Sequence, residues 1–284
     1  MTARHHLLRC TLRLGLVIGA ELCVVATARA RAGRPAASGS PAAAVADGTD
    51  PETACGGPYD APFGVGEQLR YTVKVGAIKV GEGRVEVVGR DTVRGREAWH
   101  TRFSARGRIL LYRVDDTIES WIDAACFQSL RSVQRLDEWG RSRERQIELL
   151  PERSAFRENG GPEERSVPRP LDDGAFFFFL RTQDLVVGRT YEYRQYYRPN
   201  LNPVTLRVLG RERVTVPAGS FDAIVLQPIM NTDGVFARKR DARIWLTDDR
   251  DRVMVKMTSK LALGSLTMSL MSIRSPVNSS EASQ

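Results

Sequence analysis

Hydrophobic and polar residues alternate at every second position through much of the chain, and the first clear run covers residues 68–75. Side chains on a β-strand point to opposite faces in turn, so this alternation predicts a strand with one buried face. The row expected to be buried is Leu69, Tyr71, Val73 and Val75.

Similar rows follow at short intervals, which predicts an antiparallel sheet of about a dozen strands. They include Val85 with Val87, then Trp99 with Phe103, and then Val114, Ile118 and Ile122. The segments Leu130–Trp139 and Arg141–Leu150 form a hairpin around Gly140, and Asn159-Gly160 marks a tight turn between two short strands. The remaining strands are expected at Arg189–Arg198, Val204–Leu209, Arg213–Val216, Phe221–Met230, Val235–Leu246, Val253–Leu261 and Ser265–Ile273.

One segment departs from this alternation. Asp172 or Asp173 is suited to cap a helix that runs through four consecutive phenylalanines, Phe176 to Phe179, and ends near Arg181. Such an unbroken apolar run does not fit a half-exposed strand. The predicted fold class is therefore all-β, a long curved antiparallel sheet (half-barrel, barrel or β-spiral) with one short helix packed against its concave face.

The N-terminus predicts export. Arg4 and Arg9 lie in a positive segment, a largely apolar stretch follows, and Ala28-Arg29-Ala30 fits a cleavage site. We predict a signal peptide over 1–30, a flexible Ala/Pro/Gly leader over 31–61, a single antiparallel β domain over 62–273, and a polar tail over 274–284. The expected location is the periplasm or cell envelope.

Cleavage of the signal peptide would remove two of the four cysteines and leave Cys55 and Cys126. An oxidising compartment permits a disulfide between them, although their spacing alone does not show that the side chains meet. Both alternatives, a Cys55–Cys126 disulfide and two unpaired thiols, fit the sequence.

The net charge of +8 does not form a basic stripe. Arginine and glutamate alternate along predicted strands, as in Arg84 with Glu86 and Glu192 with Arg194. This pattern is typical of a solvated surface with ion pairs, so we expect no nucleic-acid partner. A weak attraction to anionic lipid headgroups stays open.

Sequence motifs for catalysis are lacking. The chain has no nucleophile elbow, phosphate-binding loop, dinucleotide fingerprint or zinc-protease motif, and His100 is the one histidine outside the predicted signal peptide. We therefore expect no enzyme activity, no cofactor and no metal site. Three acidic doublets, Asp115-Asp116, Asp172-Asp173 and Asp248-Asp249, keep a carboxylate-dependent glycan hydrolase as the less favoured alternative.

Aromatic residues are abundant where a simple sandwich would not need them. Their ordinary role is core packing, but a curved sheet closed by a helix can also enclose an apolar cavity for a lipid or another hydrophobic ligand. A structural module that binds an envelope protein partner through a sheet edge is a further alternative. The residues we predict to line such a cavity are Trp99, Phe103, Phe176, Phe177, Phe179, Tyr193 and Trp245.

Several short motifs together resemble a known bacterial family. They are Phe63-x-x-Gly66-Glu67-x-Leu69-x-Tyr71, Gly76-x-Ile78-x-x-Gly81, Phe179-Leu180-Arg181, Val216-Pro217-Ala218-Gly219-Ser220-Phe221 and Ile244-Trp245-Leu246-Thr247-Asp248-Asp249. In order and spacing they are similar to the envelope family catalogued as domain of unknown function 3108, over about residues 62–273. Met254 stands where that family commonly has proline. The resemblance implies a periplasmic protein with a half-barrel or β-spiral sheet, and it brings no catalytic residues.

Overall fold

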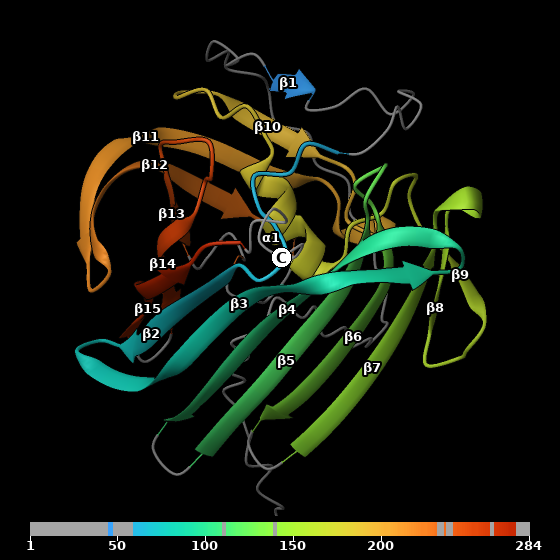
Figure 1. Cartoon of the computed structure of the whole chain (residues 1–284), viewed down its shortest axis with the longest axis horizontal. Coiled ribbons are helices and arrows are strands. Elements are labelled where there is room, and N and C mark those ends of the chain that lie inside the picture. Colours follow the sequence, from blue (N-terminus) through green and yellow to red (C-terminus); the bar gives the residue numbers. More distant parts are fainter. Residues whose placement is uncertain are drawn as a thin grey trace, which may run out of the picture.

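The computed structural model describes residues 45–47, 59–109, 112–138, 141–231, 236, 241–261 and 264–276. Its described strands form one sheet that is antiparallel except where β1 pairs in parallel with β10 (Figure 1). The strands are β1 (Val45–Asp47), β2 (Gln68–Val75), β3 (Ile78–Val93), β4 (Arg96–Ile109), β5 (Tyr112–Asp123), β6 (Ser129–Glu138), β7 (Arg141–Leu150), β8 (Ala155–Glu158), β9 (Glu163–Arg165), β10 (Thr190–Tyr193), β11 (Val204–Val216), β12 (Gly219–Ile229), β13 (Arg243–Thr247), β14 (Met254–Leu261) and β15 (Gly264–Arg274).

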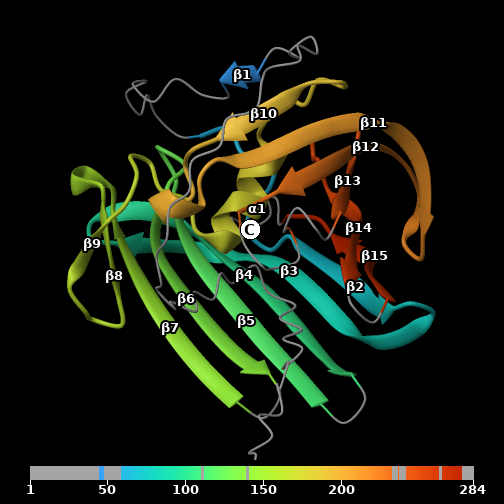
Figure 2. The same cartoon turned by 180° about the vertical axis from the view of Figure 1, so that it is seen from behind.

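The sheet is strongly curved and open, with β1 and β9 at its two edges. Its order places β15 beside β2, so the C-terminal strands β10–β15 continue directly into β2–β9. Helix α1 (Asp173–Arg181) lies between the β10–β12 side and the β3–β7 side in both views (Figures 1 and 2). Two short 3-10 turns, Pro151–Arg153 and Pro199–Leu201, complete the described elements. The predicted fold class is confirmed.

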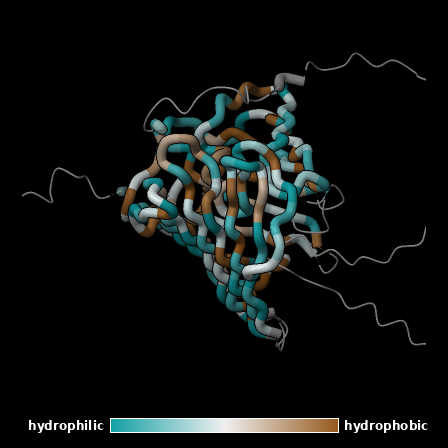
Figure 3. Tube along the Cα trace, turned by 90° about the vertical axis from the view of Figure 1, so that its right-hand side faces the viewer, coloured by the Kyte–Doolittle hydropathy of each residue, from teal (hydrophilic) through white to brown (hydrophobic). Residues whose placement is uncertain are grey.

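Alternating burial along the strands builds the core. Leu69, Tyr71 and Val73 of β2 are buried, as are Val85 and Val87 of β3, while Arg70 and Lys74 are exposed. Hydrophilic and hydrophobic positions therefore alternate along the traced chain (Figure 3). The period-two pattern placed these rows on the correct face.

Two glycines allow β3 and β4 to approach closely. Gly81 lies opposite Gly107, and a Cβ on either residue would collide with the backbone of the other strand, at Arg106 O or Val80 O. Any larger side chain would push the strands apart, because the obstructing atoms are backbone atoms. The close approach of β3 and β4 therefore explains the glycine at position 81 in the motif Gly76-x-Ile78-x-x-Gly81.

Helix α1 begins as the sequence predicts. Asp172 is the N-cap, and its Oδ1 accepts hydrogen bonds from the backbone N–H groups of Gly174 and Ala175 at 2.9 and 3.3 Å. The preceding segment is held from both sides. Pro170 O accepts from Ser129 N, while the backbone of Leu171 exchanges hydrogen bonds with residues 195 and 197.

Some boundaries differ from the prediction. Val204–Val216 is one strand rather than two, because a bulge between Val208 and Gly210 interrupts its alternation without ending its pairing. Conversely, β10 stops at Tyr193 instead of reaching Arg198, since Tyr196 and Tyr197 are buried in a turn that leads to Pro199.

The predicted signal peptide lies outside the described residues, as do most of the leader and residues 277–284 of the tail. These domain boundaries stay predictions. Within the described part, no helix is long and apolar enough to span a membrane.

Candidate functional site

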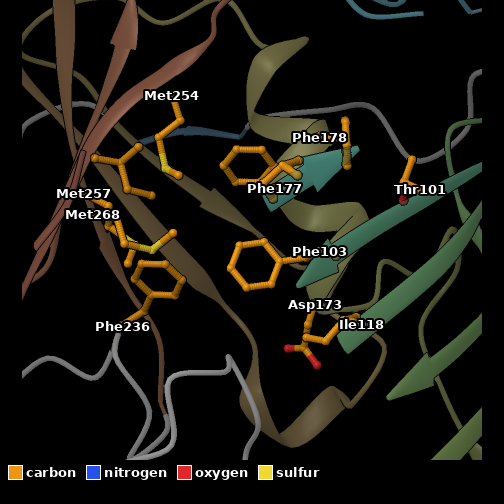
Figure 4. A pocket seen from close by; sticks show the side chains of 13 residues that line it. Thr101, Phe103, Ile118, Asp173, Phe177, Phe178, Phe236, Met254, Met257 and Met268 are labelled. Atoms are coloured by element: carbon orange, nitrogen blue, oxygen red, sulfur yellow. The ribbon is translucent and has the colours of Figure 1, made fainter. Parts of the chain in front are cut away.

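A small apolar cavity lies between α1 and the concave face of the sheet (Figure 4). Its volume is about 50 Å³. Side chains reach it from β3–β5, from α1, and from β13–β15 on the opposite side. The lining residues are Val85, Thr101, Phe103, Ile118, Asp173, Gly174, Phe177, Phe178, Phe236, Ile244, Met254, Met257 and Met268.

Three methionines form one wall of the cavity. Met254 and Met257 come from β14, and Met268 comes from the neighbouring β15 (Figure 4). Gly83 of β3 leaves the space that Met268 needs, because a Cβ at Gly83 would lie 2.9 Å from the Met268 Cε atom. Methionine has three rotatable side-chain bonds, so this wall can change shape more easily than one of branched residues.

Phenylalanines form the facing wall. Phe177 and Phe178 project from α1, and Phe103 of β4 lies below them in Figure 4. Their rings are not stacked flat, since Phe177 and Phe178 meet edge to face with centroids 5.6 Å apart. The cavity is thus bounded by a helix on one side and a flexible methionine wall on the other.

Of the seven predicted lining residues, Phe103 and Phe177 reach this cavity, and the other five do not. Trp99 packs against Phe63 and Phe127. Trp245 lies on the opposite face of β13 from the lining residue Ile244, and its Nε1 donates to Glu212 Oε2 at 2.9 Å. Phe176, Phe179 and Tyr193 contact one another in the core.

The sequence pattern missed the methionine wall. Met268 continues the buried row of Leu266 and Leu270, so alternation along the last strand could have identified it. Met257 likewise continues the apolar row of Val253 and Val255. Met254 could not be found this way, because it falls on the row of Lys256 and Thr258 and faces the cavity only through the shift in the pairing of β13 with β14. A ligand role for any of these residues stays a prediction.

One acid is among the lining residues: Asp173, the first residue of α1, which is only 2% exposed. Its Oδ1 accepts from the Tyr196 hydroxyl and its Oδ2 accepts from Gln134 Nε2, both at 2.8 Å. Burial raises the pKa of Asp173 to about 7. The hydrogen bond from Tyr196 lowers this pKa, and the charge of the neighbouring Asp172 carboxylate raises it further.

Asp172 is fully buried beside it. Its Oδ1 accepts from the Ser120 hydroxyl at 2.5 Å in addition to the two helix N–H groups. Burial also raises the pKa of Asp172, and the Ser120 hydrogen bond opposes this. Gly174 permits this contact, since a Cβ there would collide with Ser120 Oγ.

The other end of α1 is held by a buried ion pair. Arg181 Nη1 and Nη2 donate to Glu67 Oε1 and Oε2 at 2.6 and 3.0 Å, and the same guanidinium donates to the carbonyls of Pro62 and Asp251. None of these hydrogen bonds goes to the last carbonyls of α1 itself, so Arg181 does not cap its own helix. It links α1 to the start of β2 instead.

The remaining acidic doublets have structural partners. Asp115 forms ion pairs with Arg106 and Arg113 on the outer face, while Asp116 is buried on the inner face. Asp249 Oδ1 accepts from Thr247 Oγ1 and two backbone N–H groups of its turn, beside an open polar cleft of about 410 Å³. Among the described residues, no group of three His, Cys, Asp or Glu side chains is arranged to hold a metal ion.

Cys126 is buried and disulfide-bonded. Its partner lies outside the described residues, as does Cys55, so the Cys55–Cys126 pairing stays a prediction. His100 stacks on Trp121 with ring centroids 4.4 Å apart and lies 3.1 Å from Glu119 Oε1. Arg102 and Arg135 also donate to Glu119, so His100 is part of an ion-paired surface on the convex face.

Comparison with known proteins identifies one family. The family model described as protein of unknown function (DUF3108) matches residues 70–271, which is more than half of the chain. No curated protein matches.

Three solved structures are similar at low identity. A β-barrel-like DUF1849 protein from Brucella abortus has 12% identity and a TM-score of 0.46, over 76% of this chain and 99% of its own. A candidate lipoprotein from Parabacteroides distasonis has 9% identity and a TM-score of 0.34, over 75% and 98%. A candidate exported protein with a YmcC-like fold from Bacteroides fragilis has 12% identity and a TM-score of 0.30, over 76% and 99%.

Proposed function

The chain belongs to the DUF3108 family, and we propose that it is a non-enzymatic cell-envelope protein that binds a hydrophobic ligand between α1 and its curved sheet. The observation that carries this proposal is the apolar cavity bounded by three methionines and four phenylalanines. The signal-like N-terminus supports the envelope location.

The cavity volume sets what binding requires. Sites for drug-sized ligands are roughly 300–1,000 Å³, whereas this cavity holds about 50 Å³. A lipid chain therefore enters only if side chains move. Because α1 is hydrogen-bonded to the rest of the domain at both ends, the additional space comes from the methionine wall and Phe236 rather than from the helix.

The free energy of binding favours an extended hydrocarbon chain over a compact ligand. Each methylene group moved from water into an apolar site gains about 0.8 kcal/mol. A chain that follows the row of Met254, Met257 and Met268 adds these gains one methylene at a time, while methionine rotamers adjust to its thickness.

The partner-binding alternative has less support. The described edge strand β9 is three residues long, and its side chains Glu163, Glu164 and Arg165 are all exposed and charged. Short, charged edge strands disfavour pairing with another strand. The hydrolase alternative has less support as well, because the two carboxyls with raised pKa values, Asp172 and Asp173, are buried rather than placed across an open cleft.

Two measurements test the proposal. Protein purified from its native envelope is extracted with organic solvent, and the extract is analysed by mass spectrometry for bound lipid. Binding of the uncharged fluorescent probe N-phenyl-1-naphthylamine is then compared between wild type, Met268→Trp and Met271→Trp.

Met268→Trp fills the cavity, whereas Met271 is 41% exposed on the same strand and serves as the matched control. We expect probe binding to fall at least about tenfold in M268W and to be unchanged in M271W. Equal affinity in both variants, with no lipid in the extract, would refute the proposal.

A further inference from the structure

We propose that the cavity takes an uncharged hydrocarbon group and that its occupancy is coupled to one proton on Asp173. This inference rests on the proposed function, since it names the ligand class and the regulation of the same site. The observations that carry it are the place of Asp173 in the cavity wall, its burial, and the charges around it.

Asp173 is the one ionisable residue among the thirteen described residues that line the cavity. Among these described lining residues there is no lysine, arginine or histidine that could neutralise a carboxylate or phosphate headgroup. An anionic headgroup would face an acid in an apolar surrounding, which costs several kcal/mol unless the charge is paired. The ligand group inside the cavity is therefore uncharged.

The charges packed around Asp173 favour its neutral form. The Asp172 carboxylate, at the N-cap position directly before it, raises the pKa of Asp173. Arg145 of β7, whose charge lowers the pKa of Asp173, is ion-paired with Glu158 of β8, as is Arg198. Tyr196 and Tyr197 contribute neutral phenols, and β6 contributes the neutral Gln134.

The hydrogen bonds of Asp173 can serve either protonation state. Gln134 Oε1 is buried and has no hydrogen-bond partner, whereas Gln134 Nε2 donates to Asp173 Oδ2. A half-turn of this amide presents Oε1 to Asp173, so that Oε1 accepts the proton of the neutral acid. Burial places the pKa of Asp173 near 7, so the proton is exchanged near neutral pH.

The cavity links this proton to the ligand. An ionised carboxylate at the cavity wall draws water to itself, and a cavity of about 50 Å³ has room for it, because roughly 10–15 Å³ of such space is enough to hold one water molecule. A hydrocarbon group in the same space excludes that water. Ionisation of Asp173 therefore weakens ligand binding. By thermodynamic reciprocity, ligand binding raises the proton affinity of Asp173.

The test is a pH series with N-phenyl-1-naphthylamine on the full chain, by fluorescence and by equilibrium dialysis. We expect affinity about fivefold higher at pH 6 than at pH 8, the ratio for one linked proton whose pKa rises by about one unit on binding. Asp173→Asn should bind the probe with less than about twofold variation over this range. Asp116→Asn is the matched control, because it removes a buried acid that does not line the cavity, and it should keep the wild-type pH dependence.

A second measurement does not depend on how the variants fold. Calorimetry of wild type at pH 7.5 in two buffers of different ionisation enthalpy should show proton uptake on probe binding. Binding that is independent of pH, without proton uptake, overturns the coupling and leaves the proposed function standing. No probe binding at any pH overturns both. Equal affinity for the anionic probe 8-anilinonaphthalene-1-sulfonate at the same site overturns the assignment of an uncharged ligand.

Discussion

The two ends of helix α1 are both buried, yet they are held by opposite kinds of chemistry. At the C-terminal end, Arg181 and Glu67 pair two full charges with near-ideal geometry, and backbone carbonyls accept the remaining guanidinium protons. At the N-terminal end, Asp172 and Asp173 are two adjacent acids that depend on hydroxyl, amide and backbone donors.

The two ends therefore differ in how much they stabilise the fold and in how they respond to pH. Removing one partner of a buried ion pair costs several kcal/mol of stability, because the other charge is left buried and unpaired. Buried acids without a direct cation respond to pH instead, because burial raises their pKa values towards neutrality. The C-terminal end of α1 is thus held by a charge pair, and its N-terminal end by two acids whose pKa values are raised by burial.

The largest expected effect comes from breaking the C-terminal pair. Glu67→Ala leaves the Arg181 guanidinium, whose side chain is fully buried, without its counter-charge, and we expect a loss of about 3–5 kcal/mol in the free energy of unfolding. Urea denaturation measures it. The double variant Glu67→Leu with Arg181→Met should recover much of this loss, and a double variant no better than E67A would contradict the explanation.

The next effect is the pH dependence of stability. The folded-state pKa of Asp173, about 7, lies above its ordinary value of 3.8. The folded state therefore holds more protons between these values, and stability that is fully present below pH 4 is lost as pH rises through 7. Between pH 5 and pH 8 we expect a decrease on the order of 2–3 kcal/mol.

Denaturation curves at the two pH values measure this decrease. Asp173→Asn should remove most of it and be more stable than wild type at pH 8. A wild type that is more stable at pH 8 than at pH 5 would show that Asp173 stays ionised in the folded protein.

A smaller effect is expected from the helix cap. Asp172→Ala removes the acceptor of two helix N–H groups and of the Ser120 hydroxyl, which costs about 1–2 kcal/mol. Asp172→Asn keeps a capping oxygen and serves as the control. Equal destabilisation by both variants would mean that the charge of Asp172, and not its cap, stabilises the helix.

The smallest expected effect comes from an exposed ion pair near the C-terminal end of α1. It tests whether an ion pair stabilises the fold there because it is buried or because of where it lies. Arg250 pairs with Asp60 beside the same end of α1, but both side chains are largely exposed. We expect Arg250→Ala to change the thermal unfolding midpoint by no more than about 1 °C. A change comparable to that of E67A would contradict the role assigned to burial.

Much of the fold follows from local pattern. The alternation of 68–75 gave the buried row of β2, and Asn159-Gly160, both with positive φ, forms the turn between β8 and β9. The Asp172 cap and the phenylalanine run gave α1 at its observed position. These signals are local because capping, turn formation and strand alternation involve residues only a few positions apart.

The candidate site was less accessible to such reasoning. The sequence does not distinguish the four consecutive phenylalanines Phe176 to Phe179. In the structure, Phe177 and Phe178 line the cavity, whereas Phe176 and Phe179 pack on Tyr193. The direction of each ring depends on how α1 is rotated against the sheet. That rotation is set by hydrogen bonds that Asp172, Asp173 and Arg181 form with side chains outside the helix. Their partners, Ser120, Gln134 and Glu67, lie 39 to 114 residues away in the sequence.

The sequence by itself determined the all-β class, the single capped helix and the rows of residues that the sheet buries, because these depend on periodicity and on neighbouring residues. Only the tertiary structure decided which rows meet. The shifted pairing of β13 with β14 brings Met254 to the cavity beside Met257, and the regular pairing of β14 with β15 places Met257 opposite Met268. Long-range contacts placed Glu67 on Arg181 and Asp173 at the cavity. Distances across a folded sheet depend on all the pairings between its strands at once, and no local pattern contains them.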